Sequence, residues 1–218
     1  MSDPPHANPR SDATRNRLLR AGAELFATRG FRSTTIRAIC TRARANLAAV
    51  NYHFRDKDGL YRAVLKDSLS RAFEKYPPTW GLGPDPTPDD RLRAWIRAFF
   101  YRLLDDAPDA FHGPLLAREM ASPTPALAGL VEGVLRPVIE ILHDILRDLL
   151  GPGIPPVARN AVVASVAGQV LFYRHCRPVI ERLNPEIRYS REDLERWSEH
   201  VARFCLAGIA SLRAQGDR

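Results

Sequence analysis

The sequence lacks the features that mark membrane-spanning, secreted and metal-binding chains. No run approaches the ~18 to 20 apolar residues that a bilayer-spanning helix needs. Residues 1–10 are polar, contain prolines and lack the apolar core of a signal peptide. The cysteines, Cys40, Cys176 and Cys205, are odd in number and show no CxxC spacing, which argues against a disulfide framework or a zinc site. We therefore expect a cytoplasmic chain with reduced, buried cysteines, no metal, no cofactor and no membrane contact.

Catalytic motifs are also missing. No nucleophile with its base, no pair of catalytic carboxylates and no phosphate-binding loop occurs at a recognisable spacing. The six histidines are scattered, and Glu24, Glu119, Glu132 and Glu140 fall on different predicted segments. The sequence therefore predicts that the protein is not an enzyme, with a helical enzyme as the alternative.

Proline is absent from residues 10–76, whereas the rest of the chain holds all 18 prolines. Because proline interrupts helices, the first segment can be helical throughout, apart from short turns. Residues 77–88 contain five prolines and two glycines, a composition typical of a linker. Helical spacing of apolar residues resumes beyond it, without strand-like alternation or internal repeats. The predicted fold class is all-α.

Apolar spacing and capping residues place the individual helices. The first is expected to end near Arg29, ahead of Gly30, and Thr34 is the expected N-cap of a short second helix. A turn at residues 43–46 leads to a third short helix over 47–53. Later helices are expected over about 56–75, 92–103, 126–150 with Pro137 inside, 156–183 and 190–214, with a segment from Pro108 that Gly113 and Pro114 must kink.

Positive charge is concentrated near the N-terminus. Residues 10–57 hold eleven Arg or Lys against three acidic residues, whereas residues 58–218 hold 21 of each sign. A basic module on a neutral body is the pattern of a protein that binds the phosphate backbone of a nucleic acid. A solvated arginine-rich surface without a partner is the alternative.

Residues 34–53 have the pattern of a helix-turn-helix, in which the second helix presents side chains to base edges in the major groove. The small residues Ala48 and Ala49 permit close approach, and an asparagine can pair bidentately with adenine. Val50 and Phe54 are expected in the core. The larger side chains expected near DNA are Leu47, Asn51, Tyr52 and His53.

This stretch resembles the N-terminal domain of the tetracycline-repressor (TetR) family. The matching positions are Thr14-Arg15, Leu19, Ala21, Leu25-Phe26-Ala27, Gly30-Phe31, Thr34-Thr35-Ile36, Ile39, Ala43, Tyr52-His53-Phe54, Lys57 and Leu60. The resemblance implies a helix-turn-helix DNA-binding domain over residues 11–71, the linker at 77–88 and a C-terminal helical ligand-binding and dimerisation domain over 89–218. It also implies a homodimer on a palindromic double-stranded operator, usually a repressor released by a small-molecule effector. Control by a protein partner or by a redox change is the alternative.

The resemblance implies that phosphates of DNA are contacted at the start of the second helix, on the third helix and at the start of the fourth, by Thr34, Thr35, Tyr52, His53 and Lys57. Three residues depart from the family pattern: Arg44 replaces the usual turn glycine, Cys40 the usual alanine and Asn51 a frequent tyrosine. A positive φ at Arg44 would carry a steric cost. The predicted DNA-binding residues are Thr34, Thr35, Arg44, Asn46, Leu47, Ala49, Asn51, Tyr52, His53 and Lys57.

The last two long helices of the family pair with their copies in a four-helix bundle, and apolar or small residues here provide matching stripes. The predicted interface residues are Ala161, Ala164, Gly168, Leu194, Trp197, Val201, Phe204, Gly208 and Ile209. Packing of these stripes within their own subunit is the alternative.

An effector pocket is expected among aromatic or polar residues within apolar runs. The candidates are Trp95, Phe99, Phe111, His112, Arg118, Glu119, Phe172 and His175. Each aromatic residue could instead belong to the core, and Arg118 with Glu119 could be solvated. The neighbours His175 and Cys176 could suggest a metal or redox switch, but without further ligands they indicate packing.

Overall fold

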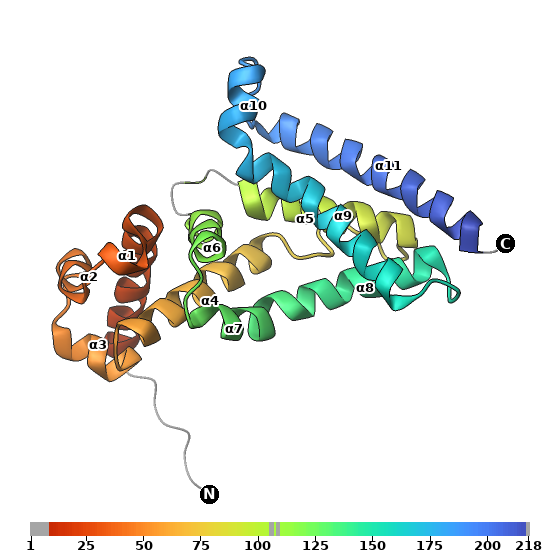
Figure 1. Cartoon of the computed structure of the whole chain (residues 1–218). Coiled ribbons are helices and arrows are strands. Elements are labelled where there is room, and N and C mark those ends of the chain that lie inside the picture. The colour runs from red at the N-terminus through yellow and green to blue at the C-terminus, as the bar shows by residue number, and fades with distance from the viewer. Residues whose placement is uncertain (1–8, 105–106, 108–109, 217–218) are drawn as a thin grey trace, which may run out of the picture. The chain divides into compact units, whose positions relative to one another are not determined.

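A computed structural model describes residues 9–104, 107 and 110–216, and these residues form helices and loops without a strand, which confirms the all-α prediction (Figure 1). The helices are α1 (Pro9–Ser33), α2 (Ile36–Ala43), α3 (Leu47–Phe54), α4 (Lys57–Lys75), α5 (Pro88–Leu104), α6 (His112–Ala121), α7 (Ala126–Leu130), α8 (Arg136–Leu150), α9 (Pro156–His175), α10 (Arg177–Leu183) and α11 (Arg191–Gly216), and a π-helical turn, η1, spans Val131–Leu135.

The chain forms two compact units that do not follow the order of the sequence. The first unit comprises residues 1–71 and 107–131, and the second comprises residues 72–106 and 132–218. Helices α6 and α7 therefore belong with the N-terminal helices, although α5 precedes them. The domain limits expected from the sequence remain a proposal, and residues 76–87 between α4 and α5 contain turns and no helix.

The core of the first unit forms around α1. Leu18, Leu19 and Phe26 recur at helical spacing along α1 and are buried, and α1 contacts α2, α3 and α6. Gly30 has φ 81° and ψ 166°, so the regular helix is broken there although helical residues continue to Ser33. A glycine takes this conformation without the clash that a Cβ would cause. The predicted end near Arg29 corresponds to this break.

The second unit packs α5 against α8, α9 and α11. Leu92, Ile96 and Phe100 of α5 are fully buried at helical spacing. The ring of Trp95 is also buried, and its Nε1–H donates to the carbonyl of Val138 at 3.3 Å. This hydrogen bond satisfies the polar atom of a side chain that otherwise lies in an apolar core.

Three of the expected helices differ in detail from the structure. No kink is needed at Pro114, because α6 begins only at His112 and proline is tolerated in a first helical turn. The expected helix over 126–150 passes through η1, which ends two residues before Pro137. A proline ring clashes with the carbonyl four residues earlier in a regular helix, and the wider π turn provides a place for it. The expected helix over 156–183 is divided at Cys176, two residues before Pro178.

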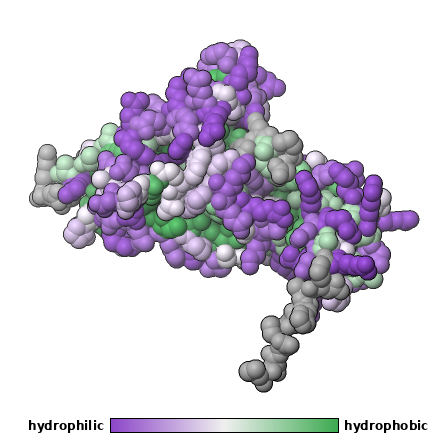
Figure 2. Space-filling view, turned by 180° about the vertical axis from the view of Figure 1, so that it is seen from behind, coloured by the Kyte–Doolittle hydropathy of each residue, from purple (hydrophilic) through white to green (hydrophobic). Residues whose placement is uncertain are grey.

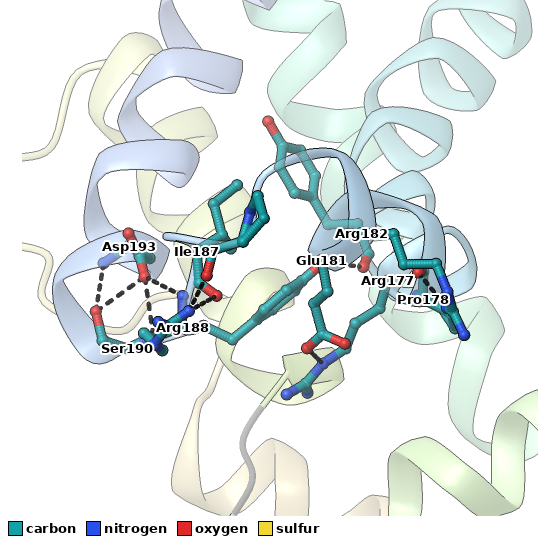
Figure 3. Close-up of polar contacts among 11 residues, drawn as sticks. Arg177, Pro178, Glu181, Arg182, Ile187, Arg188, Ser190 and Asp193 are labelled. Carbon is teal, nitrogen blue, oxygen red and sulfur yellow. Dashed lines mark hydrogen bonds and ion pairs between the residues drawn. The ribbon is translucent and has the colours of Figure 1, made fainter.

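Polar contacts fix the connection from α10 to α11 (Figure 3). Ser190 and Asp193 cap the start of α11 reciprocally: the Asp193 carboxylate accepts from the Ser190 N–H at 3.2 Å, and the Ser190 hydroxyl accepts from the Asp193 N–H at 3.1 Å. Tyr189 has φ 53°, a region that costs a non-glycine residue energy. Its ring is buried against Trp197, and its hydroxyl donates to the carbonyl of Tyr173 at 3.2 Å. These contacts hold the strained residue in place.

Hydrophilic side chains cover most of the face shown in Figure 2, with hydrophobic residues surfacing in a band among them. No helix within the described residues is both long enough and apolar enough to cross a membrane. All three cysteines are free, and Cys40 and Cys205 are buried.

Candidate nucleic-acid interface

Each of the two short helices of the helix-turn-helix begins at a side-chain cap. Thr35 Oγ1 accepts from the N–H of Ala38 at 3.1 Å ahead of α2, and Asn46 Oδ1 accepts from the N–H of Ala49 at 2.8 Å ahead of α3. Isolated helices of eight residues are unstable in water, and such caps satisfy N–H groups that have no partner inside the helix. The prediction that Thr34 caps α2 is wrong by one residue.

Thr34 has a different role from the one predicted. Its side chain is fully buried, and its hydroxyl contacts the carbonyls of Leu25 at 3.1 Å and Gly30 at 2.8 Å. The hydroxyl is therefore engaged inside the first unit, at the end of α1, and is not exposed to a phosphate.

Helix α3 presents one buried face and one exposed face. Val50 and Phe54 are buried, which confirms their expected place in the core. Leu47 is 56% exposed and Tyr52 is 80% exposed. Solvent exposure of a leucine and a tyrosine to this extent on one short helix marks a surface suited to a partner. Asn51 is exposed on the same helix.

His53 on α3 and Lys57 at the start of α4 are groups of the kind that can meet a phosphate. His53 is partly exposed, and its ring lies edge-on to that of Tyr52 with centroids 4.9 Å apart. Lys57, at the start of α4, donates from Nζ to the carbonyl of Arg32 at 3.3 Å and lies 4.5 Å from the ring centroid of Phe31. These two weak contacts hold the ammonium group in place beside the helix-turn-helix.

The turn between α2 and α3 is built on Arg44, which adopts φ 50° and ψ 49°. The backbone of Arg44 is therefore in the left-handed region, where a non-glycine residue carries a steric cost. Its N–H points back to the last turn of α2 and contacts the carbonyl of Thr41 at 3.3 Å. Cys40, one turn earlier, is buried, and burial raises the pKa of its thiol. Its Sγ lies 3.6 Å from the carbonyl oxygen of Asn46, so the thiol ties α2 to the start of α3.

The predicted effector residues fall into both units. Trp95 and Phe99 lie on α5 of the second unit with ring centroids 5.1 Å apart, and Phe172 and His175 are exposed on α9. The remaining four, Phe111, His112, Arg118 and Glu119, belong to the first unit. The structure therefore does not gather the eight residues into one site within either unit, and the pocket stays a prediction.

Arg118 and Glu119 anchor α6 within the first unit. The guanidinium of Arg118 donates to the carbonyls of Ala27 and Thr28, both at 2.7 Å. The Glu119 carboxylate is fully buried and accepts from the hydroxyl of Tyr61 at 2.8 Å. Burial, with the adjacent carboxylate, raises the pKa of Tyr61 well above its usual range. Glu119 is therefore removed from solvent, whereas Arg118 is exposed but has its guanidinium bound to the end of α1.

The second unit has a cavity that the sequence did not indicate. It has a volume of about 450 Å³ and lies among residues 80–86, α5 and α11. The guanidinium of Arg97 lies 4.4 Å from the ring centroid of Trp80 and donates to the Glu195 carboxylate at 2.6 Å. The hydroxyl of Tyr101 donates to the same carboxylate at 2.7 Å. Burial, with this hydrogen bond, raises the pKa of Tyr101 to about 12, so the tyrosine stays protonated at neutral pH.

The predicted dimerisation residues separate into a buried and an exposed group. Leu194, Trp197, Val201 and Ile209 are buried by their own chain. In contrast, Phe204 is 64% exposed. The other exposed members of the predicted set are Ala161, Ala164, Gly168 and Gly208.

Two family models match the chain. The model of the tetR family of bacterial regulatory proteins matches residues 18–64. The model of the C-terminal domain of the HTH-type transcriptional dual regulator CecR matches residues 88–209. Among the described residues, no cluster of three or more His, Cys, Asp or Glu side chains could hold a metal ion.

Curated relatives and solved structures agree with these matches. The chain is 32% identical over 63 residues to the transcriptional regulator UidR of Escherichia coli (strain K12), and it spans about a third of the length of that relative, 32%. It is 30% identical over 208 residues to the transcriptional repressor NicS of Pseudomonas putida, covering 91% of this chain and 93% of NicS. The crystal structure of AibR in complex with isovaleryl coenzyme A and operator DNA shares the fold, with a TM-score of 0.64 at 18% identity over 89% of this chain and 97% of AibR.

Proposed function

The chain belongs to the TetR family of bacterial regulatory proteins, and we propose that it is a repressor that binds a specific operator through α3 and is released by a small-molecule effector. The observation that carries the proposal is that α3 has one buried face and one exposed face. Val50 and Phe54 fix it to the core, while Leu47 and Tyr52 are exposed although they are large and apolar or aromatic. A helix held in this way can enter a major groove as a rigid element.

The DNA contacts that we propose fall into two kinds. Leu47, Asn51 and Tyr52 reach base edges, where leucine can contact a thymine methyl group and asparagine can pair with adenine. Lys57, His53 and the capped start of α2 at Thr35 meet phosphates, which position the protein without reading sequence. Asn46 and Ala49 complete the start of α3, and Thr34 is omitted because it is buried.

A homodimer would place two copies of α3 on a palindromic operator. Heads of this kind read half-sites about 34 to 36 Å apart, one turn of the double helix. The exposed members of the predicted interface, with Phe204 as the largest, are the surfaces that we assign to the second copy. Burying Phe204 against its copy would remove from water a side chain that a monomer leaves exposed.

The effector site is proposed in the second unit. This unit contains most of the region that matches the CecR C-terminal domain model and holds the cavity beside Trp80 and Arg97. The likeness to AibR, a structure that contains both isovaleryl coenzyme A and operator DNA, supports control by a ligand. Release would follow from a population shift between two conformations. A ligand that binds the conformation with low operator affinity more tightly than the other favours that conformation, and operator affinity falls by at most the ratio of the ligand's two affinities.

The proposal includes two simpler statements. The protein acts in the cytoplasm, where a bacterial chromosome lies, and it does not catalyse a reaction. Both are supported by its family membership and by the regulators UidR and NicS among its relatives.

The direct test is binding to a labelled fragment of the DNA upstream of its own gene, against a scrambled competitor, over a salt series. Lys57→Ala should weaken binding to every sequence and reduce the salt slope by about one, because one phosphate contact is lost. Asn51→Ala and Tyr52→Ala should also change sequence preference. Arg62→Ala is the matched control, since Arg62 is an exposed cation on α4 outside the proposed contacts.

The outcomes separate the parts of the proposal. Equal, sequence-independent losses from all three variants would remove the base-reading role of Asn51 and Tyr52. Absence of binding even at low salt would contradict the DNA-binding function itself. An effector found by its release of the wild-type complex should still bind Lys57→Ala, because the two sites lie in different units.

A further inference from the structure

A second cavity, entirely within the first unit, lies between α1, the end of α2 and the start of α6, and has a volume of about 740 Å³. This volume is within the range of small-molecule sites in proteins. None of the side chains that α3 exposes lines it. Its charged and aromatic walls are Arg17, Arg20, Glu24, Arg42, Arg44 and Phe111.

The charge of this cavity is strongly positive, with four guanidinium groups against one carboxylate. Glu24 is occupied by Arg42, at 2.8 Å. Arg17 is held in place by hydrogen bonds at 3.1 Å to the carbonyl of Ala43 and to the hydroxyl of Thr14. Positively charged groups gathered on one concave surface attract an anion more strongly than scattered ones do.

All four arginines of the cavity are exposed. Unlike Arg17 and Arg42, Arg20 and Arg44 form no hydrogen bond or ion pair through their side chains among the described residues. Their donors are therefore available to a ligand. An arginine presents N–H groups in a planar fork that matches two oxygens of a phosphate.

Arg44 keeps this position at a conformational cost. Its φ of 50° belongs to a region that glycine occupies freely and other residues avoid. Strained residues cluster where the side chain has a function. The sequence predicts a DNA contact for Arg44, and in the structure this residue lines the cavity.

We propose that this cavity binds a phosphorylated small molecule that carries an aromatic ring, a ligand of the nucleotide class. The arginines match the phosphates, and the half-buried ring of Phe111 offers a surface on which a base can stack. A DNA backbone could supply phosphates, but its stacked bases would leave Phe111 without a partner.

The regulatory consequence rests on the proposed function, whereas ligand binding does not. Arg44 forms the turn that precedes Asn46, the N-cap of α3. A polyanion in the cavity would neutralise positive charge beside the helix-turn-helix and hold this turn. We therefore expect it to weaken DNA binding.

The test is calorimetric titration of the full-length protein, without DNA, with ADP, pyrophosphate and adenosine. ADP carries both phosphates and a ring, and the other two carry one each. We expect ADP to bind most tightly, with a Kd below about 1 mM, pyrophosphate more weakly, and adenosine not measurably. Arg20→Gln and Arg44→Gly should each weaken ADP about tenfold or more, since each removes a charged hydrogen bond. Arg44→Gly also suits the turn, so the variant should fold.

Two controls make the result decisive. Phe111→Leu should lower the affinity for ADP towards that for pyrophosphate and leave the affinity for pyrophosphate unchanged. Arg62→Gln should change neither affinity. The proposal is overturned if ADP does not bind, or if it binds Arg20→Gln and Arg44→Gly as well as the wild type. If these two variants instead lose affinity for all DNA sequences while ADP does not bind, the phosphate belongs to the DNA backbone. DNA binding measured without ADP tests the proposed function separately.

Discussion

The buried contact between Tyr61 and Glu119 gives the sharpest prediction on stability. The Tyr61 hydroxyl donates to one carboxylate oxygen at 2.8 Å, and Thr124 donates to the other through its N–H at 2.8 Å and its hydroxyl at 2.9 Å. Both Tyr61 and Glu119 are buried, so neither can exchange a lost partner for bulk water. A charged acceptor that loses its donor under these conditions destabilises the folded state.

Tyr61→Phe removes the donor alone. The ring contacts with Phe26 at 4.9 Å and Phe31 at 4.8 Å, measured between centroids, would remain. The expected loss in free energy of unfolding is therefore that of one hydrogen bond to a charged group, about 1.5 to 3 kcal/mol. Glu119→Ala leaves three donors without an acceptor and opens a space, for which we expect about 3 to 5 kcal/mol.

The assay is urea unfolding followed by circular dichroism, with Tyr189→Phe as the matched control. Tyr189 donates to a neutral carbonyl at 3.2 Å, so its loss should be smaller, about 0.5 to 1.5 kcal/mol. In the double variant Tyr61→Phe/Glu119→Ala the losses should not add, because the two side chains share one interaction. Additive losses, or a change under about 0.5 kcal/mol for Tyr61→Phe, would refute the account of this contact.

Three further predictions follow from single contacts. Thr35→Ala removes the N-cap bond to the N–H of Ala38 and should lower the free energy of unfolding by about 1 kcal/mol, measured in urea, whereas Thr35→Ser should not. Burial would raise the pKa of Asp193, but hydrogen bonds, first from Ser190, bring this pKa below its usual value. The ionised Asp193 therefore stabilises the folded protein above the pKa that the group has in the unfolded chain, and this stabilisation is lost as the pH falls through the pKa that it has in the folded protein. The urea concentration at the midpoint of unfolding should therefore fall less steeply in Asp193→Asn than in the wild type as the pH is lowered from about 5 to about 2. Phe204→Glu should shift the protein from dimer to monomer in sedimentation velocity, because it places a charge on the exposed face of α11, and an unchanged dimer would contradict the assigned interface.

Local signals account for the parts of the structure that sequence predicted well. The inward positions of Val50 and Phe54 on α3 follow from helical spacing alone, since residues four apart share a face. The proline-free segment became α1 to α4, because helix propensity and capping act within a few residues. The sequence marked Arg44 as the residue in the place of the usual turn glycine, and the structure shows that its φ is positive.

Contacts between distant residues account for the errors. Thr34 and Thr35 are equally good caps in sequence, and only the broken end of α1 provides the buried carbonyls that take Thr34 instead. Arg118 and Glu119 were candidates for an effector pocket, with solvation as the alternative, and the sequence did not indicate that Glu119 meets Tyr61 across 58 residues or that Arg118 meets Ala27 across 91. No periodicity carries such information, so the assignment of α6 to the first unit required the structure.

The end of α1 shows what this assignment means for the helix-turn-helix. The last carbonyls of a helix lack hydrogen-bond partners within it, and the break at Gly30 leaves the carbonyls before it without such partners. Arg118 of α6 satisfies the carbonyls of Ala27 and Thr28, and Thr34, directly before α2, reaches those of Leu25 and Gly30. A movement of α6 along α1 must therefore either break both Arg118 hydrogen bonds or move the end of α1 with it. In the second case the start of α2 moves too. The helix-turn-helix of this chain is thus tied to residues well outside the segment 18–64 that matches the tetR family model.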